Sequence, residues 1–360
     1  MVCHLYKFFL VFSAIVLQLL LPLRASAELY TLRVGSGHPA GPTAYVTVLR
    51  DYLVPELRRR VSEETEHELR IIEGYAGSIA SVAETLEAVQ IGILDIGGFC
   101  TCFEPAKMFL HNFQYFVPFG PQDAQVGIRI ARQVYDTHPW LMEHLEENYR
   151  QTVIAINGWD NYHLGSSVAW ETMDDLGGVK IAGAGPNLPW LESAGVIPVQ
   201  STLPDGYMAL QTGVYSGWLM FPSAYFSYKF HEPAPYYTLI GFGAMGGAIL
   251  VTMNTRSLDR LPSDVRQIVL EVGRSYEVEA GRVLDERQVL GLENLRNSGA
   301  AVRELSDAVR ADWARSLSNF PNEMAKEADS RGMPGSEVLR TYIEAVAQSG
   351  YDWPVPYIIN

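Results

Sequence analysis

The sequence predicts an α/β protein of two lobes, with a ligand cleft between the lobes and one long helix that bridges them. Strand and helix patterns alternate from 29 to 97, and a second alternation runs from about 158 to 240. A single apolar stripe then continues along 263–297. Two such lobes leave a cleft at the carboxyl ends of their strands, where ligands of α/β proteins usually bind.

The first alternation has the pattern of a doubly wound sheet. Residues 29–34 alternate apolar and polar side chains, as a half-buried strand does. Residues 91–97 form a short apolar run that suits a buried parallel strand. Strands that alternate with helices indicate parallel pairing. The predicted elements are strands at 29–34, 69–72 and 91–97 and helices at 43–61 and 78–90.

The second alternation predicts a sheet of its own. A helix at 123–134, which continues near 140–147, and a strand at 151–156 lead into it. The elements predicted next are a turn and strand at 177–182, strands at 197–199 and 215–221, and helices at 188–194 and 205–212.

The stripe along 263–297 predicts one long helix, because its apolar residues recur at steps of three, four and seven. At ~1.5 Å per residue this helix would span about 50 Å, more than the width of one small lobe. Gly273, Gly281 and Gly291 disfavour an unbroken helix. A strand at 302–305 and helices at 307–331 and 336–348 complete the prediction.

Residues 1–27 have the pattern of a secretory signal peptide. Lys7 precedes an apolar run at 8–21, and the small residues Ala25 and Ala27 mark the cleavage site. The apolar run is shorter than the ~20 residues that cross a membrane. We therefore expect export and cleavage after Ala27, and an uncleaved anchor is the alternative.

Charge and motifs exclude several functions. The chain has 27 Lys and Arg against 41 Asp and Glu, a net charge of −14, and its longest basic run is 58–60. Nucleic acids and anionic membrane surfaces bind clustered cations, so neither is an expected partner. No nucleophile elbow, zinc-binding H-E-x-x-H or phosphate-binding loop occurs. We expect no catalytic residues, no metal and no cofactor.

Two cysteines remain after the signal peptide, Cys100 and Cys102. A C-x-C pair lacks the second pair that a zinc site needs, and a disulfide across two residues is strained. We therefore expect two half-buried, unpaired cysteines on a strand or loop.

The order of several short motifs resembles the substrate-binding subunits of tripartite ATP-independent periplasmic (TRAP) transporters. The resemblance covers nearly all of the chain after the signal peptide. The matching segments are 86–95, 117–119, 173–181, 207–217, 230–232 and 295–305. It implies a periplasmic-binding-protein-like fold with two mixed sheets and flanking helices. It also implies uptake of small organic acids by hinge closure and delivery to the membrane subunits of the transporter.

The sequence departs from this family at its polar ligand anchors. Ala182 stands where the family carries an arginine that clamps the substrate carboxylate, a pairing that the guanidinium geometry suits. His163 stands where a second arginine is common, and the position of a polar residue falls near Met220 and Phe221. These replacements put the usual carboxylate clamp in question.

Carrying over the matching positions gives a candidate ligand site rich in aromatic residues. Aromatic walls favour planar or apolar ligands. We expect an aromatic-bearing or less acidic solute, held by stacking and by Asn161, His163 and Trp indole donors. The candidate residues are His38, Tyr75, Gly77, Phe99, Thr101, Trp159, Asn161, His163, Ala182, Trp218, Met220 and Tyr225.

The lobes are expected to be interleaved: 28–157 with about 247–290 in the first, and 158–246 with about 291–345 in the second. The leading hypothesis is a periplasmic solute-binding protein that is a monomer or a homodimer. The alternatives are a ligand sensor for a signalling receptor and a periplasmic enzyme that uses Asp160, His163 or Asp205.

Overall fold

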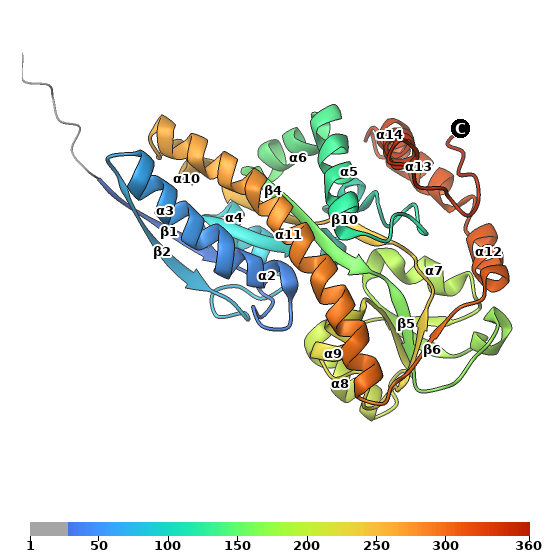
Figure 1. Ribbon diagram of the computed structural model, residues 1–360. Coiled ribbons are helices and arrows are strands. Elements are labelled where there is room, and N and C mark those ends of the chain that lie inside the picture. Colours follow the sequence, from blue (N-terminus) through green and yellow to red (C-terminus); the bar gives the residue numbers. More distant parts are fainter. Residues whose placement is uncertain (1–27) are drawn as a thin grey trace, which may run out of the picture.

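The computed structural model describes residues 28–360, so the predicted signal peptide lies outside the described residues. The described chain forms two mixed sheets with helices packed on them (Figure 1). The first sheet has the strand order β2-β1-β3-β10-β4, and the second has the order β11-β9-β5-β8-β6-β7. The predicted α/β fold of two lobes with two mixed sheets is confirmed.

The first sheet combines parallel strands with one long antiparallel strand. β1 pairs in parallel with β2 and β3, whereas β10 runs antiparallel to both β3 and β4. Every residue of β10 is buried, so this strand has none of the alternation by which the others were predicted. The strands are β1 (Leu29–Gly35), β2 (Glu68–Gly74), β3 (Ile96–Cys100), β4 (Gln151–Asn161) and β10 (Ala244–Asn254).

The second sheet is built mainly from short strands. β5 is antiparallel to β8 and β9, and β6 is parallel to β7 and β8. β11 is added to the edge in parallel with β9. The strands are β5 (His163–Ser166), β6 (Lys180–Gly183), β7 (Ile197–Gln200), β8 (Gly217–Met220), β9 (Tyr236–Leu239) and β11 (Ala301–Glu304).

Helices cover both sheets and extend past them at the C-terminus. α14 packs against α13 and α5, so the end of the chain returns to the helices of the first sheet. The helices are α2 (Ala44–Val48), α3 (Val54–Glu64), α4 (Thr85–Gln90), α5 (Ala124–Thr137), α6 (Trp140–Tyr149), α7 (Leu188–Glu192), α8 (Leu203–Gln211), α9 (Pro222–Ser227), α10 (Thr255–Asp259), α11 (Ser263–Asn297), α12 (Asp307–Ser316), α13 (Phe320–Ser330) and α14 (Gly335–Gln348). None of the helices from residue 28 onward combines the length and apolarity that a membrane span requires.

The long helix α11 runs diagonally from the first sheet to α9 beside the second (Figure 1). It is one helix of 35 residues, as the stripe predicts. Its glycines mark close contacts rather than breaks. A Cβ atom at Gly273 would lie 2.0 Å from the carbonyl oxygen of Ile154, and one at Gly291 would lie 2.7 Å from the backbone of α9.

Three segments connect the sheets. Only Tyr162 separates β4 of the first sheet from β5 of the second. The loop 240–243 returns from β9 to β10, and α11 is the third connection. Gly241 and Gly243 have φ values of +74° and +109° in that loop, a backbone region in which glycine is favoured. We call residues 161–163 and 240–243 the hinge.

Several predicted boundaries are wrong. The strand predicted at 91–97 begins only at Ile96, because Gly92, at φ +77°, ends α4 in a turn. The helix predicted at 78–90 is confined to α4. The strand predicted to end at 156 continues to Asn161, because β10 pairs with β4 along its length. Pairing between distant segments decides these boundaries.

Candidate functional site

The candidate site is a small cavity between the two sheets, with about 20 Å³ of free space. Trp159 and Tyr162 reach it from the end of β4, and Trp218 and Met220 reach it from β8. The loop after β3 and the segment before α8 close the other sides. The cavity is lined by Cys102, Phe103, Trp159, Tyr162, Ala184, Ser201, Leu203, Trp218, Leu219, Met220 and Phe221.

Aromatic rings hold each other in place around this cavity. Trp159 stacks on Phe221 with ring centroids 4.9 Å apart and an angle of 18° between the planes. Tyr162 meets the same Phe221 ring edge-on at 5.3 Å. Trp218 stacks on Phe230 at 5.0 Å. These packed rings present preformed faces on which a planar ligand can stack.

No Lys, Arg, Asp or Glu belongs to the cavity lining. Position 182, where the family resemblance places an arginine, carries Ala182, which is buried on β6 and pairs with Trp218 on β8. The charge of a doubly ionised ligand would therefore meet no cation on these walls. Burying an unpaired charge costs several kcal/mol, so the walls suit a ligand of low charge.

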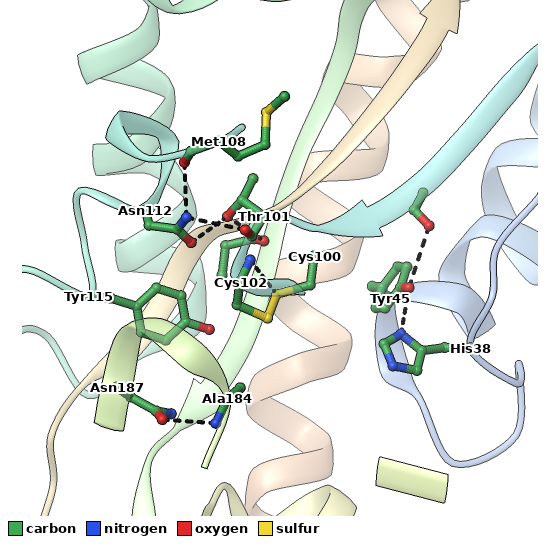
Figure 2. Close-up of a disulfide and its surroundings, with 12 residues drawn as sticks. His38, Tyr45, Cys100, Thr101, Cys102, Met108, Asn112, Tyr115, Ala184 and Asn187 are labelled. Atoms are coloured by element: carbon green, nitrogen blue, oxygen red, sulfur yellow. Dashed lines mark hydrogen bonds between the residues drawn. A yellow bond between two sulfur atoms is a disulfide. The ribbon is translucent and has the colours of Figure 1, made fainter. Parts of the chain in front are cut away.

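The two cysteines form a disulfide at the edge of the cavity (Figure 2). Our prediction of unpaired cysteines is wrong. The short helical turn Thr101–Phe103 folds the chain back so that the Cα atoms of Cys100 and Cys102 lie 5.1 Å apart, within the range that a disulfide bridges. Thr101 fixes this turn, because its hydroxyl donates to Asn112 at 2.9 Å. The disulfide therefore sets the position of one cavity wall.

His38 lies behind two of the cavity walls. Its ring packs against Phe103 and Trp159, with centroids 5.6 and 6.1 Å away. Nδ1 is hydrogen-bonded to the hydroxyl of Tyr45 at 2.9 Å, whereas Nε2 is buried without a partner. Burial lowers the pKa of His38 to about 4, so the imidazole is neutral at neutral pH.

Two candidate residues lie in the hinge rather than on the cavity wall. Nδ1 of His163 accepts hydrogen bonds from the backbone N–H groups of Ile240 and Gly241, both at 3.1 Å. The side-chain oxygen of Asn161 accepts from the N–H of Gly243 at 3.0 Å. These side chains fasten one crossing segment to the other.

The neutral state of His163 agrees with these contacts. An imidazole nitrogen that accepts two hydrogen bonds carries no proton. Burial, with a smaller contribution from the positive charge of Arg310, lowers the pKa of His163 to about 3. The ring therefore acts as a fixed acceptor for the hinge backbone.

Other candidate residues are buried in the core or lie on a turn outside the cavity. Phe99 is buried in β3, and the Tyr225 hydroxyl donates to the carbonyl oxygen of Ala234 at 2.7 Å. Tyr75 donates to Glu73 at 3.1 Å, and Gly77, at φ +76°, forms the following turn. Of the twelve candidates, the structure places three on the cavity wall: Trp159, Trp218 and Met220.

Most of the cavity lining was absent from the candidate list. Phe103 and Cys102 follow β3, and Ala184 follows β6, so each lies just beyond the end of a strand. Position at a strand end was the only available signal in the sequence. Ser201 and Leu203 flank the start of α8 and carried no signal that we recognise.

The acidic residues considered for catalysis serve structural roles. Asp160 is buried and accepts hydrogen bonds from the N–H and hydroxyl groups of Ser223 at the start of α9. Burial raises its pKa to about 7. Asp205 accepts from Thr202 at the start of α8. Within residues 28–360, no group of three or more His, Cys, Asp or Glu side chains could hold a metal ion.

Two sheets joined by three crossing segments, with a cavity between them, are the architecture of a two-lobed binding protein. Residues 50–328 match the family model of bacterial extracellular solute-binding protein, family 7 (DctP). The chain belongs to this family of bacterial extracellular solute-binding proteins. The chain is an extracytoplasmic solute receptor of the TRAP type, and the resemblance noted in the sequence is confirmed.

Similar proteins agree with this assignment. The C4-dicarboxylate-binding periplasmic protein DctP of Rhodobacter capsulatus is 26% identical over 286 residues, which cover 74% of this chain and 77% of the relative. A TRAP solute-binding protein of an unidentified marine microbe, specific for aromatic acids and solved with 3-hydroxybenzoate, matches with a TM-score of 0.80, 19% identity, and coverage of 90% of this chain and 99% of the other. A TRAP solute-binding protein of Rhodoferax ferrireducens with copurified benzoate matches with a TM-score of 0.79, 17% identity, and coverage of 89% and 98%.

Proposed function

We propose that the chain captures a small aromatic organic acid or a related aromatic solute in the cavity between its lobes. The observation that carries this proposal is the lining itself: stacked rings on several sides and no charged side chain. The cavity has about 20 Å³ of free space, little more than one water molecule needs, so the lobes would open to admit one ring with a small substituent.

The relatives are consistent with this ligand class. Two structures of the same fold hold 3-hydroxybenzoate and benzoate, both of which combine one ring with one carboxyl group. The relative from Rhodobacter capsulatus is named for C4-dicarboxylates, which have no ring and two charges. With Ala182 in place of the clamping arginine, we propose that this chain belongs with the aromatic binders.

The ligand is best tested by calorimetric titration of the purified chain. Benzoate and 3-hydroxybenzoate are expected to bind, and succinate and malate are not. Trp218→Ala should weaken aromatic binding about tenfold or more, because it removes one stacking wall. The matched control is Trp140→Ala, since Trp140 stacks on His144 away from the cavity. Tight succinate binding without aromatic binding would refute the proposed ligand class.

The proposed transport role involves other proteins besides this chain. We propose that the hinge opens and closes around the ligand, and that the closed form delivers it to TRAP membrane subunits. The lobes would be residues 28–157 with about 247–290 and residues 158–246 with about 291–345. Residues 1–27 would direct export and be removed. Mass spectrometry of the periplasmic form gives its first residue and tests the cleavage directly.

A further inference from the structure

We infer that His38 donates a hydrogen bond from Nε2 to an oxygen atom of the bound ligand and is thereby a specificity-determining residue of the cavity. This inference rests on the proposed function and narrows it to aromatic solutes that carry an acceptor oxygen. It gives this chain a neutral donor in a site for which the family resemblance predicts cationic clamps at positions 182 and 163.

The hydrogen bonds around His38 assign its proton to Nε2. The Ser36 hydroxyl lies 2.8 Å from the Tyr45 hydroxyl, which lies 2.9 Å from Nδ1 of His38. If the Ser36 hydroxyl donates its proton to the Tyr45 oxygen, the Tyr45 hydroxyl is free to donate its own proton to another acceptor. Its shorter contact is to Nδ1, since the carbonyl oxygen of Gly98 lies 3.4 Å away. With Nδ1 as an acceptor in a neutral ring, Nε2 carries the hydrogen.

This Nε2–H group has no partner although it is fully buried. A buried donor without an acceptor costs about 1–3 kcal/mol, so native structures rarely leave one unused. The burial that lowers the pKa of His38 also prevents a second proton from binding at neutral pH. The protein thus keeps one neutral donor buried without a partner, at a cost in free energy.

His38 lies directly behind the cavity lining, and the neighbours of its ring connect Nε2 to the cavity. Both aromatic neighbours of the ring, Phe103 and Trp159, are cavity walls. Figure 2 shows Nε2 turned away from Tyr45, toward the side on which Cys102 and Ala184 lie. These two residues also line the cavity. A ligand that stacks on the rings would bring a ring substituent to this side.

The chemistry of the Nε2–H donor determines which ligand groups it recognises. A neutral N–H group accepts no hydrogen bond and holds no net charge, so it recognises an acceptor oxygen of a carbonyl, a carboxylate or a hydroxyl group. A guanidinium clamp selects for a second charge on the ligand, whereas this neutral donor does not. We therefore expect benzamide and benzoate to bind more tightly than toluene, which has the ring without the oxygen.

Titration of these three probes into wild-type protein and two variants tests the inference. His38→Phe keeps an aromatic ring but removes the donor, and His38→Gln restores an N–H group near the position of Nε2. In wild type, the oxygen should improve affinity about tenfold over toluene. The Phe variant should bind all three probes about equally, and the Gln variant should recover much of the difference.

Tyr45→Phe provides a readout that a purely structural role would not change. Without the Tyr45 hydroxyl, Nδ1 can carry the proton, so the preference for benzamide over toluene should fall by a few fold while toluene affinity stays the same. Circular dichroism of each variant confirms the fold before titration.

The outcomes separate the two proposals. If His38→Phe keeps the wild-type preference for benzamide over toluene, or if wild type shows no such preference, the role of His38 is overturned while ring binding still supports the proposed function. If wild type binds succinate and none of the aromatic probes, the proposed function fails first and the inference fails with it.

Discussion

Replacing His163 with leucine tests whether this residue acts as the acceptor that fastens the hinge. Leucine fills a similar volume but leaves the N–H groups of Ile240 and Gly241 without a partner. Each unsatisfied buried donor costs about 1–3 kcal/mol, so the free energy of unfolding should fall by about 2–5 kcal/mol. Urea unfolding at pH 8, followed by circular dichroism, measures this loss. His163→Asn is the matched control, because its amide oxygen can accept near the position of Nδ1.

The pH dependence tests whether His163 is buried as a neutral ring. The pKa of His163 is lowered in the folded protein to about 3, from an ordinary value of 6.5. As the pH falls below 6.5, the unfolded chain binds a proton that the folded chain refuses, so wild type loses stability. The leucine variant lacks this group. The stability difference between wild type and variant should therefore be largest above pH 6.5 and shrink by up to ~1.4 kcal/mol per pH unit below it.

A steric effect predicts a different result. If His163→Leu and His163→Asn are equally destabilised at pH 8, the acceptor role is wrong. The hinge would then depend on the shape of the ring against Tyr237, which it meets edge-on at 5.8 Å.

Three further predictions concern Asp160 at the start of α9, the contact between Tyr228 and Thr43, and Gly241 in the hinge. Folding raises the pKa of Asp160 from 3.8 to about 7, so the stability that its neutral form contributes is lost as the pH rises through 7. In urea unfolding, the free energy of unfolding of Asp160→Asn should therefore rise by about 1–3 kcal/mol relative to wild type between pH 5 and 8. Tyr228→Phe removes the 3.3 Å contact between the hydroxyls of Tyr228 and Thr43, so calorimetry should show about threefold weaker ligand binding, and an unchanged affinity would contradict a role in closure. Gly241→Ala should destabilise more than Gly213→Ala, because both glycines have φ near +73° but only Gly241 also faces a side chain within 3 Å; equal thermal shifts would oppose this.

Elements that bury one face could be predicted from the sequence. The apolar stripe of α11 repeats over 35 residues, so its bounds were predicted correctly despite three glycines. Those glycines were judged by helix propensity alone. Their actual reason is the close approach of Ile154 and α9, which becomes visible only when distant segments are placed together.

Elements buried on both faces could not be predicted in this way. β10 is buried along its whole length and separates β3 from β4 in the sheet. Its sequence has no alternation, and it pairs with strands that lie about 90 to 150 residues earlier in the chain. The extension of β4 to Asn161 depends on β10 as well, so the hinge was hidden from sequence reasoning for the same reason.

The residues of the candidate site could also be predicted only in part. Trp159 and Trp218 were identified because they follow or end predicted strands, and both line the cavity. Cys102 lines it too, but its disulfide depends on a turn of three residues that no pattern predicted. Residues at strand ends were accessible to sequence reasoning, whereas the direction in which each side chain points was not.

The direction of side chains explains why the polar anchors were assigned to the ligand. In the five residues from Trp159 to His163, the first and fourth line the cavity, and the third and fifth hold the hinge backbone. The second, Asp160, holds the start of α9. Because one short segment carries all three tasks, we expect a ligand that contacts Trp159 or Tyr162 to act on the strand that His163 fastens. We therefore predict that ligand contact and lobe closure are coupled through this segment, and that the imidazole at position 163 strengthens the hinge at a position where the family resemblance places a charged ligand contact.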